Sequence, residues 1–396
     1  MNKKLLALVL LAGLSACSDN PSNLASSKQE LGEKLYEDTN LSLNRTQSCS
    51  TCHNRNHGFI DDRPDAHGLV SAVSVGDDGS SLGDRNAPTA GYARFSPDFH
   101  LGTRQRHNKH NSYTGGLGGQ FLDGREIDLK GQAGGPPTNP IEMGMPDKAS
   151  VINRLQENQY YIDSFKHLYG DEIFNDTEAA YDAMAESIGE FEKTDEFSPF
   201  DSKYDRSLSG DYILSFKENT GKALFFSQFT NCGICHQLHD NGDPVNKFKE
   251  TFTSYEYHNI AVPVNETVRL LNGVTEIDPG LENNTGLESD RGKYKVPTLR
   301  NVAITGPYMH NGVFRELKTV IEFYDHFVNP TNRANNPETG IAWSEPEVST
   351  TISSAELATA DPMTDNQLEA MVCFLRTLTD QRYEHLIVKN GIECSD

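Results

Sequence analysis

Apolar residues recur at spacings of three or four positions in several separate stretches of the chain. This spacing places them on one face of a helix, so each stretch predicts an amphipathic helix. Thr364 and Gln367 have the spacing of a capping box and mark the start of the last helix. The apolar positions are Leu31 and Leu35; Val151, Leu155, Ile162, Phe165 and Tyr169; Tyr181, Met184, Ile188 and Phe191; Leu317, Val320, Ile321 and Tyr324; and Leu368, Met371, Leu375 and Leu378.

Long segments rich in Gly, Pro, Asn and Asp separate these helices. They cover residues 54–146, most of the chain from about 237 to Thr305, and Asn329 to Pro346. Such composition is typical of loops. No stretch gives a convincing sheet, so the sequence predicts a mainly α fold with long loops.

One pentapeptide pattern, Cys-x-x-Cys-His, occurs twice, at Cys49, Cys52 and His53 and again at Cys232, Cys235 and His236. This is the attachment motif of c-type haem: two thiols bind one porphyrin, and the histidine ligates its iron. A zinc site or a disulfide is the alternative use of these cysteines. We predict two covalently bound haem c groups.

The segments around the two motifs repeat each other in the same order. Gly32–Tyr36 before the first motif is echoed by Gly221–Phe225 before the second, and Arg85–Thr89 is echoed by Val296–Asn301. The repeat is far longer than that of a solenoid. It predicts two cytochrome c-like domains, each wrapped around one haem, at residues 29–204 and 205–396.

The N-terminus has the features of a signal peptide, with two lysines, the apolar run Leu5–Leu14 and small residues before Cys17. We assign residues 1–16 to the signal peptide and 17–28 to a polar tether. Leu14–Cys17 also resembles a lipobox, in which Cys17 carries the lipid; ordinary cleavage is the alternative. The prediction is a lipoprotein on the periplasmic side of a bacterial membrane, held by the anchor alone. Ser18 favours the outer membrane over the inner one.

Two further cysteines, Cys373 and Cys394, either pair in an oxidising compartment or stay unpaired. The formal net charge of −22 makes nucleic acid an unsuitable partner. Such a surface can steer a basic redox protein, or it can simply keep the chain in solution.

Six ordered motifs extend this pattern along nearly the whole mature chain. Besides the two Cys-x-x-Cys-His pentapeptides they are Arg85–Thr89, Gln120–Arg125, Gln132 and Ala133 with Asn139–Met143, and Pro307–Gly312. With them the chain resembles the bacterial di-haem cytochrome c peroxidases, and among these the MauG-type branch. The resemblance implies that the N-terminal haem meets hydrogen peroxide and that the C-terminal haem relays electrons from an external donor.

The resemblance implies that Gln132 and Glu142 stand over the open face of the N-terminal haem. Heterolytic cleavage of the O–O bond requires a proton to move from one peroxide oxygen to the other, which a nearby carboxylate can assist. Gln132 would orient the peroxide. The alternative is that both are ordinary surface side chains.

Tyr324 lies fourteen residues after His310, where other members of the family carry an axial methionine for the second haem. The resemblance implies that Tyr324 ligates this iron, as in the MauG-type branch, and that it lowers the haem potential. The alternative is a core tyrosine. Asp78 occupies the place of a distal histidine, which implies an open first haem, although His57 and His67 remain alternative ligands.

The resemblance also implies a calcium site between the domains, with Asn86 and the carbonyls of Thr305 and Pro307 as neutral oxygen ligands. Asn86 and Thr305 are otherwise turn residues. Leu122 replaces a tryptophan that the family places between the haems. An insertion before Gln120 carries His100, His107 and His110 and is predicted to be a solvated loop.

Three functions are compatible with these features. The first is a peroxidase that reduces hydrogen peroxide with electrons from a small cytochrome c or another redox protein. The second is a MauG-like, peroxide-dependent oxidase that modifies tryptophan or tyrosine of a partner protein. The third is a non-enzymatic electron carrier. A homodimer is compatible with each of them.

Overall fold

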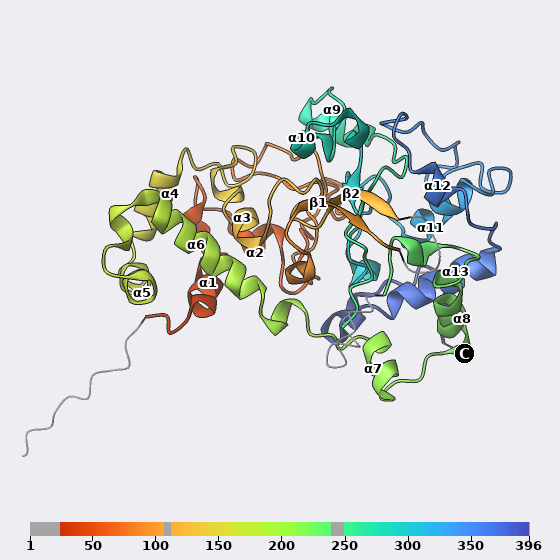
Figure 1. Ribbon diagram of the computed structural model, residues 1–396, viewed down its shortest axis with the longest axis horizontal. Coiled ribbons are helices and arrows are strands. Elements are labelled where there is room, and N and C mark those ends of the chain that lie inside the picture. The colour runs from red at the N-terminus through yellow and green to blue at the C-terminus, as the bar shows by residue number, and fades with distance from the viewer. Residues whose placement is uncertain (1–23, 107–111, 239–248, 396) are drawn as a thin grey trace, which may run out of the picture.

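The computed structural model describes residues 24–106, 112–238 and 249–395. One group of helices lies at each end of an elongated body, with long loops between them (Figure 1). The mainly helical fold predicted from the sequence is confirmed. The N-terminal helices are α1 (Lys28–Tyr36), α2 (Cys49–Cys52), α3 (Leu129–Ala133), α4 (Lys148–Leu155), α5 (Gln159–Tyr169) and α6 (Thr177–Glu192). The C-terminal helices are α7 (Lys203–Ser209), α8 (Phe216–Phe225), α9 (Glu266–Asn272), α10 (Glu282–Thr285), α11 (Leu317–His326), α12 (Ser354–Leu357) and α13 (Asp365–Arg376).

The same helix crossing occurs in both halves and explains the repeated glycines. A Cβ atom on Gly32 of α1 would lie 1.9 Å from the carbonyl oxygen of Ser187 on α6. A Cβ atom on Gly221 of α8 would lie 1.9 Å from the carbonyl oxygen of Ala370 on α13. Only glycine allows backbones to approach this closely. The sequence repeat therefore corresponds to a repeated helix pair.

Each half has its own apolar core. The first is built from residues between 25 and 197, and the second from residues between 204 and 394. In the first core the Tyr36 ring packs edge-on against Phe191 and Phe197. In the second, Phe374 of α13 packs against Phe225 and Phe252. The proposed boundary near residue 205 lies close to the start of α7.

The expectation that no sheet forms is wrong. Strands β1 (His100–Arg104) and β2 (Tyr113–Leu117) form an antiparallel pair, and so do β3 (Tyr257–His258) and β4 (Tyr294–Lys295). The first pair is largely solvent-facing along β1, and the second has only two residues in each strand. Neither strand pair has, in its sequence, the alternation of apolar and polar residues that identifies a half-buried strand.

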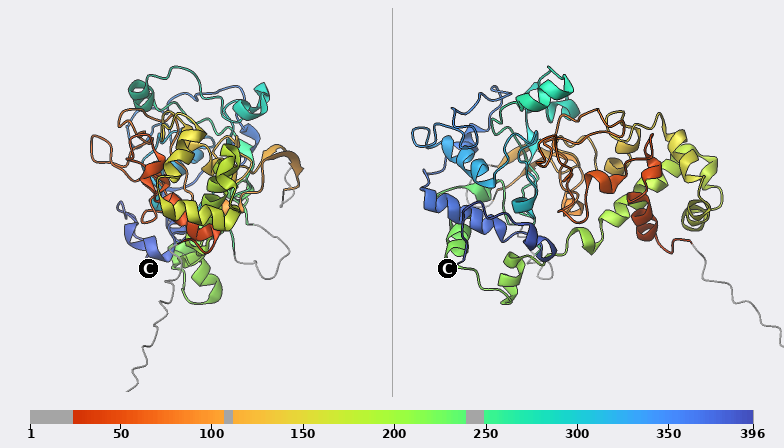
Figure 2. Two further views of the ribbon diagram at one scale, coloured as in Figure 1. Left: turned by 90° about the vertical axis from the view of Figure 1, so that its left-hand side faces the viewer. Right: turned by 180° about the vertical axis from the view of Figure 1, so that it is seen from behind.

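The described part of the predicted loop is the β1–β2 hairpin, on which His100 is exposed, and it is anchored to the C-terminal half. Arg104 Nη1 lies 3.1 Å and Arg106 Nη2 2.8 Å from opposite carboxylate oxygens of Glu256, which is fully buried. Figure 2 shows the hairpin projecting from the side of the body. His107 and His110 lie outside the described residues.

A second set of contacts joins the halves near the chain's end. Asp380 accepts hydrogen bonds from the Tyr92 hydroxyl of the N-terminal half and, at 2.8 Å, from the side-chain amide of Asn301. Close by, the fully buried Arg300 donates to both carboxylate oxygens of Asp205. The bond from Tyr92 to Asp380 joins the two halves, and Arg300 with Asp205 stabilises the C-terminal side of this junction.

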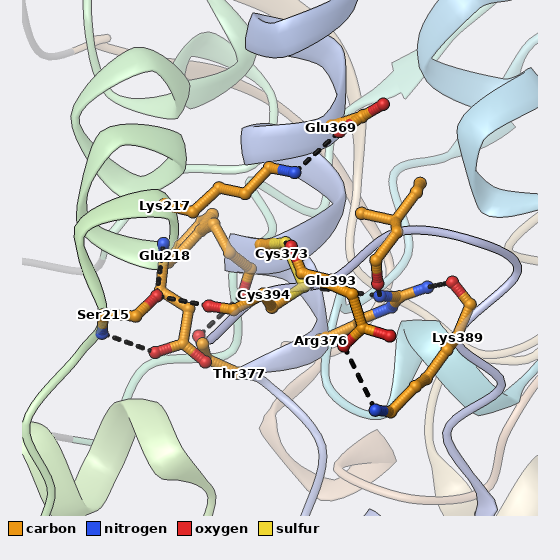
Figure 3. Close-up of a disulfide and its surroundings, with 12 residues drawn as sticks. Ser215, Lys217, Glu218, Glu369, Cys373, Arg376, Thr377, Lys389, Glu393 and Cys394 are labelled. Carbon is orange, nitrogen blue, oxygen red and sulfur yellow. Dashed lines mark hydrogen bonds and ion pairs between the residues drawn. A yellow bond between two sulfur atoms is a disulfide. The ribbon is translucent and has the colours of Figure 1, made fainter. Parts of the chain in front are cut away.

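Cys373 of α13 and Cys394 form a disulfide, which resolves the alternative that the sequence left open (Figure 3). The last residues of the chain are held to α13 at several points. Arg376 donates a hydrogen bond of 2.8 Å to the carbonyl of Ile392. Ser215, just before α8, donates one of 2.5 Å to the carbonyl of Cys394. The disulfide thus fastens the chain's end to the helix pair of the second core.

The signal peptide at 1–16 and the lipidation site Cys17 lie outside the described residues. The tether predicted for residues 17–28 ends earlier than expected. Ala25 is fully buried and its amide donates 2.9 Å to Ser164 Oγ, while the Ser27 side chain caps α1. Over the described ranges, no helix combines the length and apolar character needed to cross a bilayer.

Candidate functional site

The first Cys-x-x-Cys-His motif forms α2, which a capping box between Ser48 and Thr51 starts. Cys49 and Cys52 are one helical turn apart and therefore lie on the same side of the helix. The ring Nδ1 of His53 lies 3.2 Å from the carbonyl oxygen of Phe59. Because a carbonyl only accepts, Nδ1 carries the proton and Nε2 keeps its lone pair for a metal.

The second motif begins with Asn231 in a left-handed conformation, followed by a 3₁₀ turn, η6 (Cys232–Ile234). His236 Nδ1 lies 2.9 Å from the carbonyl oxygen of Phe252, so its Nε2 is also free to ligate. Burial lowers the pKa of His236 to about 4, which keeps the imidazole neutral. Both motifs thus present the same donor set: two thiols and one oriented neutral imidazole.

The carbonyls that orient the histidines are held by matching local structure. Phe59 and Phe252 both have left-handed backbones, with φ of 55° and 54°. Thr89 Oγ1 donates a hydrogen bond of 2.6 Å to the carbonyl of Gly58, the residue before Phe59. Thr298 Oγ1 donates one of 2.7 Å to the carbonyl of Thr251, the residue before Phe252. Bulky side chains rarely adopt positive φ, so the conformation is imposed by its surroundings.

A cavity of about 380 Å³ lies beside the second motif. Its mostly apolar wall includes Cys232, Cys235 and His236, and it extends to the junction with the N-terminal half. A haem is a large apolar plate that needs thiols for attachment and a nitrogen ligand for iron. The residues present fit that group.

Tyr324 of α11 lies on the wall of this same cavity as His236. The two residues predicted to ligate the second iron therefore line one cavity. Burial raises the pKa of Tyr324 well above its ordinary value. A cation or a hydrogen-bond donor beside the phenol oxygen would favour the phenolate.

Glu142 lies near the first motif, where its charge acts on the Cys52 thiol. Burial raises the pKa of this half-buried carboxyl, although Arg125 and a hydrogen bond from Asn139 act in the opposite direction. The Asp77 amide donates 2.7 Å to the Glu142 carbonyl, which fixes its backbone. Gln132 is half-buried on α3, whose start Asp128 caps.

Asp78, in the place of a distal histidine, and the two alternative ligands His57 and His67 lie in different surroundings. Asp78 is exposed, and its carboxylate accepts from the backbone amides of Ser80 and Ser81 at 2.8 and 2.7 Å. His57 Nε2 lies 3.0 Å from the carbonyl of Ile304. His67 is exposed in a turn closed by Asp65.

The three residues considered for calcium, Asn86, Thr305 and Pro307, all line the large cavity. The Asn86 side-chain nitrogen donates 3.0 Å to the carbonyl of Ala72, which leaves its oxygen as the group able to ligate a cation. Leu122 lines the same cavity, and its carbonyl accepts a 2.8 Å hydrogen bond from the amide of Lys295.

The sequence interpretation missed Glu192, the last residue of α6. It is buried beside Cys49, and its Oε2 has no hydrogen-bond partner among the described residues. Burial raises its pKa to about 8. The signal was present in the sequence, because Glu192 follows Ile188 by four positions and so lies on the buried face of the predicted helix.

The comparisons with known proteins agree with this geometry. A family model described as di-haem cytochrome c peroxidase matches residues 26–212. The methylamine utilization protein MauG of Paracoccus denitrificans is 48% identical over 362 residues, covering 90% of this chain and 89% of that protein. The cytochrome c peroxidase Ccp of Escherichia coli is 32% identical over 286 residues, covering 72% of this chain and 50% of that protein. The crystal structure of the diheme peroxidase BthA from Burkholderia thailandensis is similar with a TM-score of 0.78 at 26% identity, covering 94% of this chain and 91% of that one.

Glu192 gives a pH-dependent prediction. Its pKa rises from an ordinary 4.5 to about 8 on folding. Between these values the folded chain keeps the proton and the unfolded chain releases it, so this residue lowers stability as pH rises from about 4.5 to 8. Glu192→Gln is expected to remove this loss of unfolding free energy. The loss amounts to a few kcal/mol, since each unit of pKa shift corresponds to about 1.4 kcal/mol. Unfolding of the holoprotein at several pH values measures it.

The matched control is Glu178→Gln, which changes an exposed carboxylate on the same helix. It should reproduce the pH profile of the unaltered protein. If the Glu192→Gln profile also matches that of the unaltered protein, Glu192 is already ionised in the folded state and the assignment is wrong.

Proposed function

Since the chain belongs to the bacterial di-haem cytochrome c peroxidase family, in its MauG-type branch, we propose that it reduces hydrogen peroxide to water with electrons from an external donor protein. Two haems held by Cys49, Cys52 and His53 and by Cys232, Cys235 and His236 would supply irons able to exchange electrons with peroxide and with the donor. The placement of Glu142 beside the first motif carries this proposal.

Glu142 acts on the proton of the peroxide. As a carboxylate it takes the proton from one oxygen, and as the resulting acid it returns the proton to the other oxygen, which leaves as water. Burial favours the neutral form and so makes the carboxylate a better base than an exposed one. The Gln132 amide supports this step by holding the peroxide without changing its charge.

Glu142→Gln tests this role while keeping the size of the side chain. The amide cannot accept and return the proton, so we expect the rate of peroxide consumption to fall by about 10²-fold or more. Stopped-flow spectroscopy of the diferric protein with peroxide measures the rate. Glu157→Gln, which alters an exposed carboxylate paired with Arg45, serves as control. Full activity of the Glu142→Gln protein rules the proposal out.

The second axial position is proposed for Tyr324, because it shares the cavity wall with His236. A phenolate oxygen favours ferric over ferrous iron more strongly than a thioether does. The C-terminal haem would then have a low potential and stay oxidised until a donor binds.

Tyr324→Met is expected to raise the midpoint potential of the C-terminal haem, since a thioether replaces the phenolate. Tyr324→Phe offers no ligand atom and should leave a site that binds cyanide. Spectroelectrochemistry and cyanide titration of the two variants measure these effects. Spectra and potentials identical to those of the unaltered protein in both variants would show that Tyr324 is a core residue.

A second candidate function is the peroxide-dependent oxidation of tryptophan or tyrosine on a partner protein. Tyr324 and the 48% identity to the Paracoccus MauG favour it. Leu122 counts against it, because an aliphatic side chain between the two sites cannot itself be oxidised and reduced.

The two functions differ in where the electrons come from. The diferric protein is mixed with peroxide and then given either reduced cytochrome c or candidate partner proteins. Peroxide-dependent oxidation of the cytochrome, with no mass change on any partner, supports the peroxidase. Oxygen insertion or a cross-link on a partner's tryptophan or tyrosine, seen by mass spectrometry, supports the second function. An inert protein in both assays is an electron carrier only.

Two further features belong to this proposal. A calcium ion held by Asn86, Thr305 and Pro307 would stabilise the junction of the two halves, since all three line one cavity there. A lipid on Cys17 would hold the protein at the periplasmic side of a membrane, with the outer membrane preferred. The lipobox of the sequence supports this location.

A further inference from the structure

Two aromatic rings are stacked on the wall of the cavity beside the second motif. The rings of Tyr294, in β4, and His310 are 3.7 Å apart between centroids and only 12° from parallel. Both residues line the large cavity. They therefore adjoin the space that the C-terminal haem would fill.

The stacked pair also touches the N-terminal half. The amide next to Tyr294, that of Lys295, donates 2.8 Å to the carbonyl of Leu122. The carbonyl of His310 accepts a 2.8 Å hydrogen bond from the amide of Asn86. The pair thus stands at the junction of the two halves.

The Tyr294 phenol lies beside Asp278. Its hydroxyl lies 3.4 Å from the backbone carbonyl of Asp278, and the Asp278 carboxylate acts directly on the phenol. That carboxylate is fixed by Arg85 of the N-terminal half, whose Nε and Nη2 lie 2.6 and 2.7 Å from its oxygens. The Arg85 guanidinium also lies 5.5 Å from the centroid of the Tyr294 ring.

This environment decides how the phenol can be oxidised. Burial raises the pKa of Tyr294 far above its ordinary value, so the ring holds its proton at neutral pH. A phenol that loses an electron becomes a strong acid, and a buried cation radical is costly unless its proton leaves with the electron. Burial of Asp278 is outweighed by hydrogen bonds and the charge of Arg85, which lower the pKa of Asp278 to about 2, so this neighbouring carboxylate is ionised. An ionised carboxylate can take the proton of the more strongly acidic cation radical and releases it again readily.

We propose that Tyr294 is a redox relay between the two haem sites, with Asp278 as its proton acceptor. Tyr294 gives one electron toward the peroxide-oxidised N-terminal site while its phenolic proton passes to the Asp278 carboxylate. One electron from the C-terminal site and the proton from Asp278 then restore the phenol. The net change is one electron moved from the C-terminal site to the N-terminal site. This inference rests on the proposed function, whose peroxide is the oxidant.

The alternative is that Tyr294 only packs the wall. Tyr257 gives the comparison, because it belongs to the same small sheet and pairs with Lys295. Its hydroxyl donates 2.6 Å to the carbonyl of Gly118, and its ring packs edge-on against Phe99. A phenylalanine at either position keeps the ring and removes only the hydroxyl.

The experiment uses the full diferric holoprotein grown with ring-deuterated tyrosine, mixed with one equivalent of peroxide and frozen within milliseconds. Electron paramagnetic resonance should show a radical whose spectrum narrows with the label, in the unaltered protein and in Tyr257→Phe. The signal should be absent in Tyr294→Phe. A second measurement starts from protein whose C-terminal haem has been reduced before peroxide is added. Electron transfer from this haem to the N-terminal haem should be at least tenfold slower in Tyr294→Phe than in the unaltered protein.

A measurement on the unaltered protein covers the case in which Tyr294→Phe does not fold. The same electron transfer should slow at least twofold in D₂O, because the proton moves with the electron. The relay is overturned if Tyr294→Phe keeps both the signal and the rate, or if no label-sensitive radical forms although the N-terminal haem reacts with peroxide. A protein that does not react with peroxide at all overturns the proposed function, and the relay falls with it.

Discussion

The hydrogen bond from each motif histidine to a backbone carbonyl is the contact on which both sites depend. At His53 and at His236 it fixes which ring nitrogen carries the proton, and so which nitrogen can meet a metal. The carbonyl belongs in each case to a phenylalanine in a left-handed conformation. Without that bond the imidazole has no preferred orientation, and covalent attachment alone would not place its lone pair.

The surrounding structure of each half fixes the position of the phenylalanine carbonyl. A threonine hydroxyl fixes the preceding peptide, and the phenylalanine ring packs into the apolar core. The core is closed by a helix pair that crosses at Gly32 in one half and at Gly221 in the other. The two sites are thus repeated at the level of single hydrogen bonds as well as in sequence.

Much of this arrangement followed from the sequence, because helices and motifs depend on local spacing. The helix predicted from Leu317, Val320, Ile321 and Tyr324 is α11, Leu317–His326, and the last helix begins at its predicted capping box. The strands were missed because they are short or exposed. The stacking of Tyr294 on His310 joins loops with no shared pattern, so no spacing rule predicts it. The burial of Glu192 was predictable, since the residue continues the apolar face of its helix. The helix pattern considers apolar side chains alone, so it does not mark a charged residue on that face.

The anchored hairpin has a consequence for the order in which the molecule is made. Arg104 and Arg106 belong to the half that is synthesised first, whereas their partner Glu256 follows about 150 positions later. Until Glu256 has been synthesised, the two guanidinium groups stay hydrated and the hairpin has no partner surface to pack against. The first half therefore completes its fold only against the second, and contacts of such long range form late. Both halves must be in place before the shared cavity wall exists.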